Sequence, residues 1–165
     1  MTEIYIEDVL ADIVSNITYN DSAVFFDHGN YIELANKLSL KNRNNQKYPL
    51  FALIQDVTET ETSEDGVYKI YDFNMIIAYN TRQDYTTQER LTNIFKPILQ
   101  PLYRDLIEEI KSSNYFVIDR EFIDHTKTNR YFLGSETPNQ NRLNDYVDVI
   151  EINFRNMKLN TETTC

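Results

Sequence analysis

An apolar stripe through residues 86–113 constrains the fold of this chain more than any other feature. In TTQERLTNIFKPILQPLYRDLIEEIKSS, apolar residues recur at spacings of three and four over about five helical turns. Thr86 and Glu89 have the spacing of a capping box at the helix start. So long an apolar face needs an equally long apolar surface, and we expect a sheet. The stripe comprises Leu91, Ile94, Phe95, Ile98, Leu99, Leu102, Tyr103, Leu106, Ile107 and Ile110.

Two prolines, Pro97 and Pro101, stand inside this helical pattern. Each lacks the donor of an i to i−4 hydrogen bond and crowds the carbonyl four residues earlier, so the helix must kink or restart. Both share an edge of the helical wheel with Arg104 and Glu108, beside the stripe, where water can bind the freed carbonyls. Two interpretations follow: a long helix bent around a twisted sheet, or a functional hinge.

The clearest strand pattern lies between residues 50 and 81. The runs LFALIQDV and VYKIYDFNMIIAYNT are joined by a polar segment that ends in Asp65-Gly66, which predicts a long β-hairpin. In the second run, alternate residues from Tyr71 to Tyr79 are apolar, as in a half-buried strand.

Weaker patterns complete an α+β chain. We expect one domain over 1–160 and a flexible tail over 161–165. The remaining predictions are helices over 3–17 and 31–40, short strands over 22–27, 115–123 and 130–133, and a strong final strand over 145–154.

The overall charge limits the functions that this chain can have. A net charge of −10 argues against a nucleic-acid-binding face, because phosphate contacts need clustered lysines and arginines; it suits a conduit for DNA better. The apolar runs are too short to span a bilayer, and the acidic start does not resemble a signal peptide. Three scattered glycines build no phosphate loop. The single cysteine, Cys165, permits no intramolecular disulfide and favours a cytoplasmic protein.

Two segments of opposite charge are both expected to project into solvent. They are either two solvated loops or, in a head-to-tail assembly, the two halves of an interface that closes into a ring. The predicted basic loop carries Lys37, Lys41, Arg43 and Lys47. The predicted acidic hairpin tip carries Asp56, Glu59, Glu61, Glu64 and Asp65.

Two Asp-His pairs are the candidate residues for an enzyme. Asp27 with His28, and Asp124 with His125, would suit a metal- or histidine-dependent hydrolase, because a carboxylate can orient an imidazole as a base. Adjacent residues of a strand point to opposite faces, however, and no zinc-protease motif or paired cysteine motif accompanies them. We therefore expect no catalytic residue, no metal site and no cofactor.

Three stretches in this order resemble a family of small neck and tail-completion proteins of tailed bacteriophages. They are KYPLFALIQD (47–56), ERLTNIFKPILQPLYRDLIEEI (89–110) and NDYVDVIEINFRNMKL (144–159). The similar proteins belong to phages and prophages of Bacteroides-type gut bacteria, including the crAss-like group. Residues 1–20 carry no part of the pattern.

This resemblance implies both a fold and a role. The fold would be tail-terminator-like: a small, mainly antiparallel sheet with a long projecting hairpin and helices packed on one face. The role would be a ring in the virion neck, made in the host bacterial cytoplasm and without a membrane. Its partners would be further copies of itself, the portal or connector, and tail proteins. DNA would pass through the channel without specific binding, because a lumen of like charge offers it no sticking site.

Overall fold

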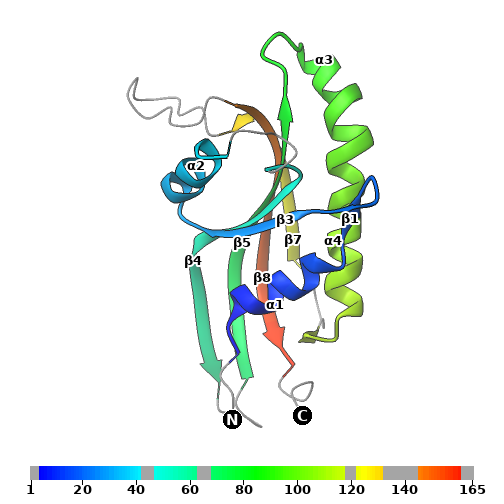
Figure 1. Cartoon of the computed structure of the whole chain (residues 1–165). Helices are drawn as coiled ribbons and strands as arrows, with labels where there is room; N and C mark the ends of the chain where they lie inside the picture. The colour runs from blue at the N-terminus through cyan, green and yellow to red at the C-terminus, as the bar shows by residue number, and fades with distance from the viewer. Residues whose placement is uncertain (1–3, 42–46, 63–67, 118–121, 132–144, 161–165) are drawn as a thin grey trace.

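The computed structural model describes residues 4–41, 47–62, 68–117, 122–131 and 145–160 (Figure 1). Its helices are α1 (Ile6–Ser15), α2 (Tyr31–Ser39) and one long helix made of α3 (Thr87–Arg90), η2 (Leu91–Leu99) and α4 (Gln100–Ser112). Its strands are β1 (Thr18–Tyr19), β2 (Ser22–Ala23), β3 (Phe25–Gly29), β4 (Leu50–Thr62), β5 (Tyr68–Thr81), β6 (Phe116–Val117), β7 (Phe122–Tyr131) and β8 (Tyr146–Leu159).

The main sheet has the order β3-β4-β5-β8, and both β6 and β7 pair with the remaining side of β8. Only β3 and β4 are parallel, so the expectation of an α+β chain with a mainly antiparallel sheet is confirmed. The predicted final strand is also present, and it continues to Leu159.

Strand alternation divides the buried residues between two faces of the sheet. Phe51 of β4 and Phe73 of β5 face the side covered by α1 and the long helix. Leu50 and Ile76 face the opposite side, which α2 covers through Leu34. The prediction that the helices pack on one face is therefore wrong, because the central strands are apolar on both faces and each face needs a cover (Figure 1).

In the described strands, three β-bulges curl the sheet, and each contains a residue with positive φ. These residues are Asp56 in β4 (95°), Asn156 in β8 (56°) and Arg130 in β7 (55°). Two of them are held by carboxylates: the Asn156 N–H donates to Asp72 at 2.7 Å, and the Arg130 N–H donates to Asp148 at 3.1 Å. Because a bulge bends its strand and increases local twist, these positions shape the curl.

The long helix begins at the predicted capping box, in which Thr86 and Glu89 cap each other. Its middle segment η2 is a π-helix that contains Pro97, and the Gln100 N–H donates to the carbonyl of Phe95, five residues earlier. The helix then continues without a break as α4, with Pro101 in its first turn. Both prolines are exposed beside the buried stripe, as predicted. The functional hinge stays a prediction.

The β4-β5 hairpin is as long as predicted, but little of its described part projects. β8 follows β5 as far as the pair Ile70 and Lys158, so only Tyr68 and Lys69 of β5 extend beyond it. The prediction of a long projecting hairpin is wrong for these residues, because hydrogen bonding to β8 incorporates β5 into the sheet centre. Residues 63–67 lie outside the described part.

One edge strand was placed incorrectly by the sequence patterns. Residues 122–131 form a single strand, β7, where two short strands were expected with His125 between them. The polar run DHTKTN has no apolar alternation because β7 lies at the edge, where most of its side chains are exposed. The predicted stretch 115–123 contains β6, which has only two residues, and the start of β7.

Candidate functional site

The basic side chains expected to form a solvent-exposed loop are largely engaged within the chain. The ammonium group of Lys37 lies 2.6 Å from the Asp27 carboxylate. The ammonium group of Lys41 lies 5.5 Å from the centroid of the Phe25 ring. Arg43 lies outside the described residues.

Lys47 contradicts the prediction of an exposed basic loop most clearly. It is 5% exposed, and its ammonium group lies 2.8 Å from Asp145, nearly a hundred positions along the chain. The Tyr48 hydroxyl donates to the same carboxylate oxygen at 3.2 Å. Burial, then the charge of Asp145, raises the pKa of Tyr48. Lys47 is buried because its ion pair joins the start of β4 to the start of β8.

Lys37 also binds a backbone carbonyl at the outer edge of β3. The Phe25 N–H donates to the Pro49 carbonyl at 3.0 Å. Because backbone groups alternate in direction along a strand, the N–H and C=O of Phe25 point towards β4, whereas those of His28 point away from it. The His28 N–H donates to the Asp27 carboxylate at 2.8 Å, and its carbonyl accepts from Lys37 at 3.1 Å. The outward backbone groups of His28 therefore have partners already, as at a protected sheet edge.

The acidic side chains of the hairpin have a basic neighbour that the sequence patterns did not single out. Glu59 lies 2.9 Å from Lys69 of β5, and hydrogen bonds from Lys69 and then Tyr71 lower the pKa of Glu59. Glu61 is the cross-strand neighbour of Lys69, and Asp56 lies in the bulge. Glu64 and Asp65 lie outside the described residues.

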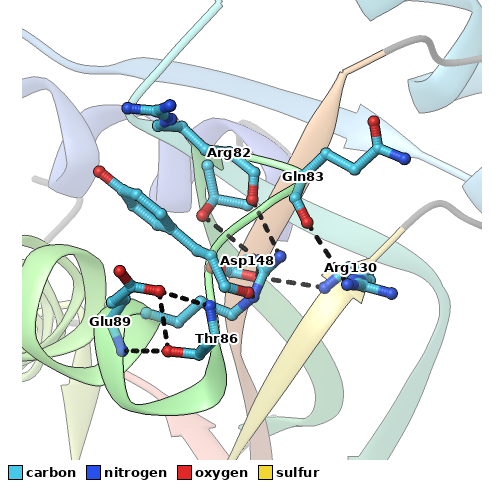
Figure 2. Close-up of polar contacts among 9 residues, drawn as sticks. Arg82, Gln83, Thr86, Glu89, Arg130 and Asp148 are labelled. Carbon is cyan, nitrogen blue, oxygen red and sulfur yellow. Dashed lines mark hydrogen bonds and ion pairs between the residues drawn. The ribbon is translucent and has the colours of Figure 1, made fainter.

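A buried ion pair joins the long helix to the sheet (Figure 2). The Arg90 guanidinium lies 2.7 Å from the Asp148 carboxylate, and the side chains are 3% and 0% exposed. Arg90 also donates to the carbonyls of Tyr85 and Arg82, so it holds the turn between β5 and α3. The second Asp148 oxygen, Oδ2, has no hydrogen-bond partner among the described residues.

Sequence reasoning missed this pair, although a signal for it exists. Arg90 stands four residues before Ile94 of the stripe, and Asp148 stands two residues before the buried Ile150. Arg90 therefore lies on the apolar face of the helix, and Asp148 lies on an apolar face of the strand. Opposite charges at two such positions indicate a buried pair.

The two Asp-His pairs lie at opposite edges of the main sheet, in β3 and β7. The His125 ring packs on the Tyr103 ring of the long helix, with centroids 4.5 Å apart. The structure thus does not bring His28 and His125 together. Within the described ranges, no three His, Cys, Asp or Glu side chains are grouped closely enough to hold a metal ion.

An open hollow of about 500 Å³ lies between β3 and α2, and His28, Glu33, Lys37 and Gln55 are among its lining residues. Gly29 also lines it, at a φ of 148°. A Cβ there would approach the Glu33 carboxylate to 2.8 Å, and Glu33 completes the capping box of α2 with Asn30. The hollow is open, and two of its lining residues already have structural roles: Glu33 in the helix cap and Lys37 at the strand edge.

The sequence matches no model of a known protein family and no curated protein. Among the helices of the described segments, none is both long and apolar enough to cross a bilayer.

The tyrosines beside α2 should make the fold sensitive to alkali. Burial, then the charges of Glu151 and Tyr31, raises the pKa of Tyr131 to about 12. An unfolded chain releases this proton near pH 10, about two units earlier. Stability should therefore be complete below about pH 10 and fall as the pH rises towards 12, because the unfolded state binds fewer protons there.

Urea unfolding from about pH 9 to about pH 12 measures this loss. Tyr131→Phe should reduce the slope, because it removes the hydroxyl whose proton the folded chain holds more tightly than the unfolded chain. Equal slopes for Tyr131→Phe and the unmodified chain would contradict the assignment.

Proposed function

We propose that this chain is a structural virion protein that forms an oligomeric ring in the head–tail neck of a tailed phage. The ring joins the portal or connector to the tail and surrounds the channel through which DNA leaves. The chain acts through its shape, its interfaces and its charge, and not through catalysis.

The observation that carries this proposal is how the three stretches resembling neck proteins meet. Lys47 of the first stretch binds Asp145 of the third, and Arg90 of the second binds Asp148 of the third. The resembling segments therefore form one connected unit, namely β4, the long helix and β8. A net charge of −10 also fits a channel that must not bind DNA.

The native mass of the purified chain, measured across concentration and salt, tests the proposal. We expect a closed ring, visible by electron microscopy, formed either by the chain alone or after addition of a neck partner. Oligomerisation should depend on salt, because charged segments contribute to the contact. A monomer that persists at high concentration and with portal, connector and tail proteins would overturn the ring.

Two variants separate this role from the hydrolase alternative. Replacing both His28 and His125 by alanine should leave assembly intact, since the His125 ring packs on Tyr103 of its own chain and neither imidazole has a catalytic task in a ring. Deleting residues 58–66 should prevent oligomerisation or docking, because it shortens the hairpin. The opposite pair of results, with loss of a hydrolytic activity in the histidine variant, would favour the enzyme.

A further inference from the structure

Two stretches of sheet edge have no neighbouring strand in the described part of the chain. β3 covers β4 only from Leu50 to Ile54, so residues 57–62 of β4 have no described neighbouring strand other than β5. β7 pairs with β8 on one side and with no described strand on the other. Such an edge presents alternate unpaired N–H and C=O groups, which are a template for another strand.

These two edges differ from the edge at β3. Asp27 and Lys37 occupy the outward N–H and C=O of His28, so β3 has less to offer an incoming strand. Along β7, by contrast, the side chains of residues 124–127 are exposed. Within the described part of the chain, Asp27 and Lys37 therefore protect the edge at β3, whereas no strand lies beside the other two.

The open edges carry opposite charges on the same face of the sheet. Glu59 is the cross-strand neighbour of Tyr71, whose side chain faces the long helix, so Glu59 and Glu61 lie on that face. Lys127 pairs with Ile150, which also faces the long helix. If the sheet continued from β7 into β4 of another copy, acidic and basic side chains would meet on one face.

Strand direction favours the same arrangement. β4, β5, β8 and β7 are each antiparallel to the next, so β7 runs opposite to β4. Copies related by a rotation that keeps the sheet order would thus place β7 of one copy antiparallel to β4 of the next. The open part of β4 pairs with residues 68–72, near the start of β5. β7 instead pairs with the part of β8 that lies mainly beside residues 73–80 of β5, nearer its end. This offset staggers the copies, as closing a sheet into a barrel requires.

We propose that residues 57–62 of β4 pair with β7 of a second copy of this chain, so that the sheet continues from subunit to subunit. This proposal deepens the proposed ring by assigning its contact, and in that respect it rests on the proposed function. The contact is heterologous, because a different edge is used on each copy. The acidic hairpin thus meets β7 of the neighbour, and not the segment around Lys37 and Lys47, because Lys47 is buried.

Charge reversal tests the pairing through the dissociation constant of the assembly. Lys127→Glu and Glu61→Lys should each weaken self-association by about tenfold or more, because like charges would then face each other across the contact. The double variant should regain most of the affinity. Lys96→Glu, at an exposed position on the long helix, is the matched control and should change little. Circular dichroism verifies that every variant is folded.

Cross-linking tests the geometry directly. Thr60 and Thr126 are exposed on the same face, on β4 and β7 respectively. In a Cys165→Ser background, the chain with both Thr60→Cys and Thr126→Cys should give a ladder of oligomers with a short bismaleimide. Each single-cysteine variant should stay uncross-linked, because each copy then carries only one half of the contact.

The outcomes distinguish this proposal from the ring itself. A ring that is unaffected by the charge changes and gives no ladder would overturn the β4–β7 contact and leave the ring standing. Open filaments with the expected charge dependence would support the strand pairing and contradict a closed ring. Dimers cross-linked through Thr126→Cys alone would indicate β7–β7 pairing, and a persistent monomer without any ladder would overturn both proposals.

Discussion

Replacing Arg90 by methionine should lower the free energy of unfolding by about 3–5 kcal/mol. The Asp148 side chain is fully buried, and Arg90 is its ion-pair partner at 2.7 Å. Without the guanidinium, the carboxylate keeps only the N–H of Arg130 among the described residues, while its desolvation is unchanged. The turn before α3 would also lose the two hydrogen bonds that Arg90 donates to Tyr85 and Arg82.

Urea unfolding of the single and double variants measures this effect. Adding Asp148→Asn to Arg90→Met should recover part of the loss, because the unpaired buried charge is then absent. The matched control is Arg82→Met: Arg82 lies 3.0 Å from Asp84, but both side chains are about two-thirds exposed. Such surface pairs contribute roughly 0–1 kcal/mol. A loss for Arg90→Met as small as that of Arg82→Met would contradict a structural role for the buried pair.

Phe73→Ala should destabilise the fold by about 3–5 kcal/mol, because it opens a cavity in the core beneath the long helix. Phe73 is fully buried in the centre of the sheet. Its ring stacks on Phe154 of β8 at a centroid distance of 4.7 Å and lies 6.5 Å from Phe116 of β6. One truncation thus removes contacts with two other strands.

The same unfolding measurement, with Phe154→Ala and the double variant, completes a double-mutant cycle for the stacked pair. We expect a coupling of about 0.5–1.5 kcal/mol between the rings. Phe25→Ala is the control, because Phe25 is only partly buried in the edge strand β3. If Phe73→Ala cost no more than Phe25→Ala, Phe73 would not be a central core residue.

Local patterns predicted the elements whose signals lie within a few residues of one another. The capping box of Thr86 and Glu89, the apolar stripe of the long helix and the second strand of the hairpin are where the sequence places them, whereas β4 continues into the predicted polar connection as far as Thr62. β7 was missed because an exposed edge strand needs no apolar alternation. The apolar periodicity did not specify the π-helical geometry around Pro97 either, because both a kink and a restart of the helix can accommodate a residue without a backbone N–H.

For the candidate site, the sequence named the charged residues but not their partners. Lys47 was expected in solvent, yet it is buried against Asp145, and Lys37 caps the edge of β3. Asp145 is far from Lys47 in the sequence, and Asp27 lies in a different element from Lys37, so neither partner follows from a periodicity within one helix or strand.

The sequence by itself determined the helices, most of the strands and the charge of this protein, because spacing, capping and composition act over a few residues. Only the tertiary structure decided that α2 covers the face opposite the long helix and that Arg90 meets Asp148. It also decided which strands lie at the edges of the sheet formed by the described residues. The physical reason is that burial and strand pairing depend on which distant segments lie side by side.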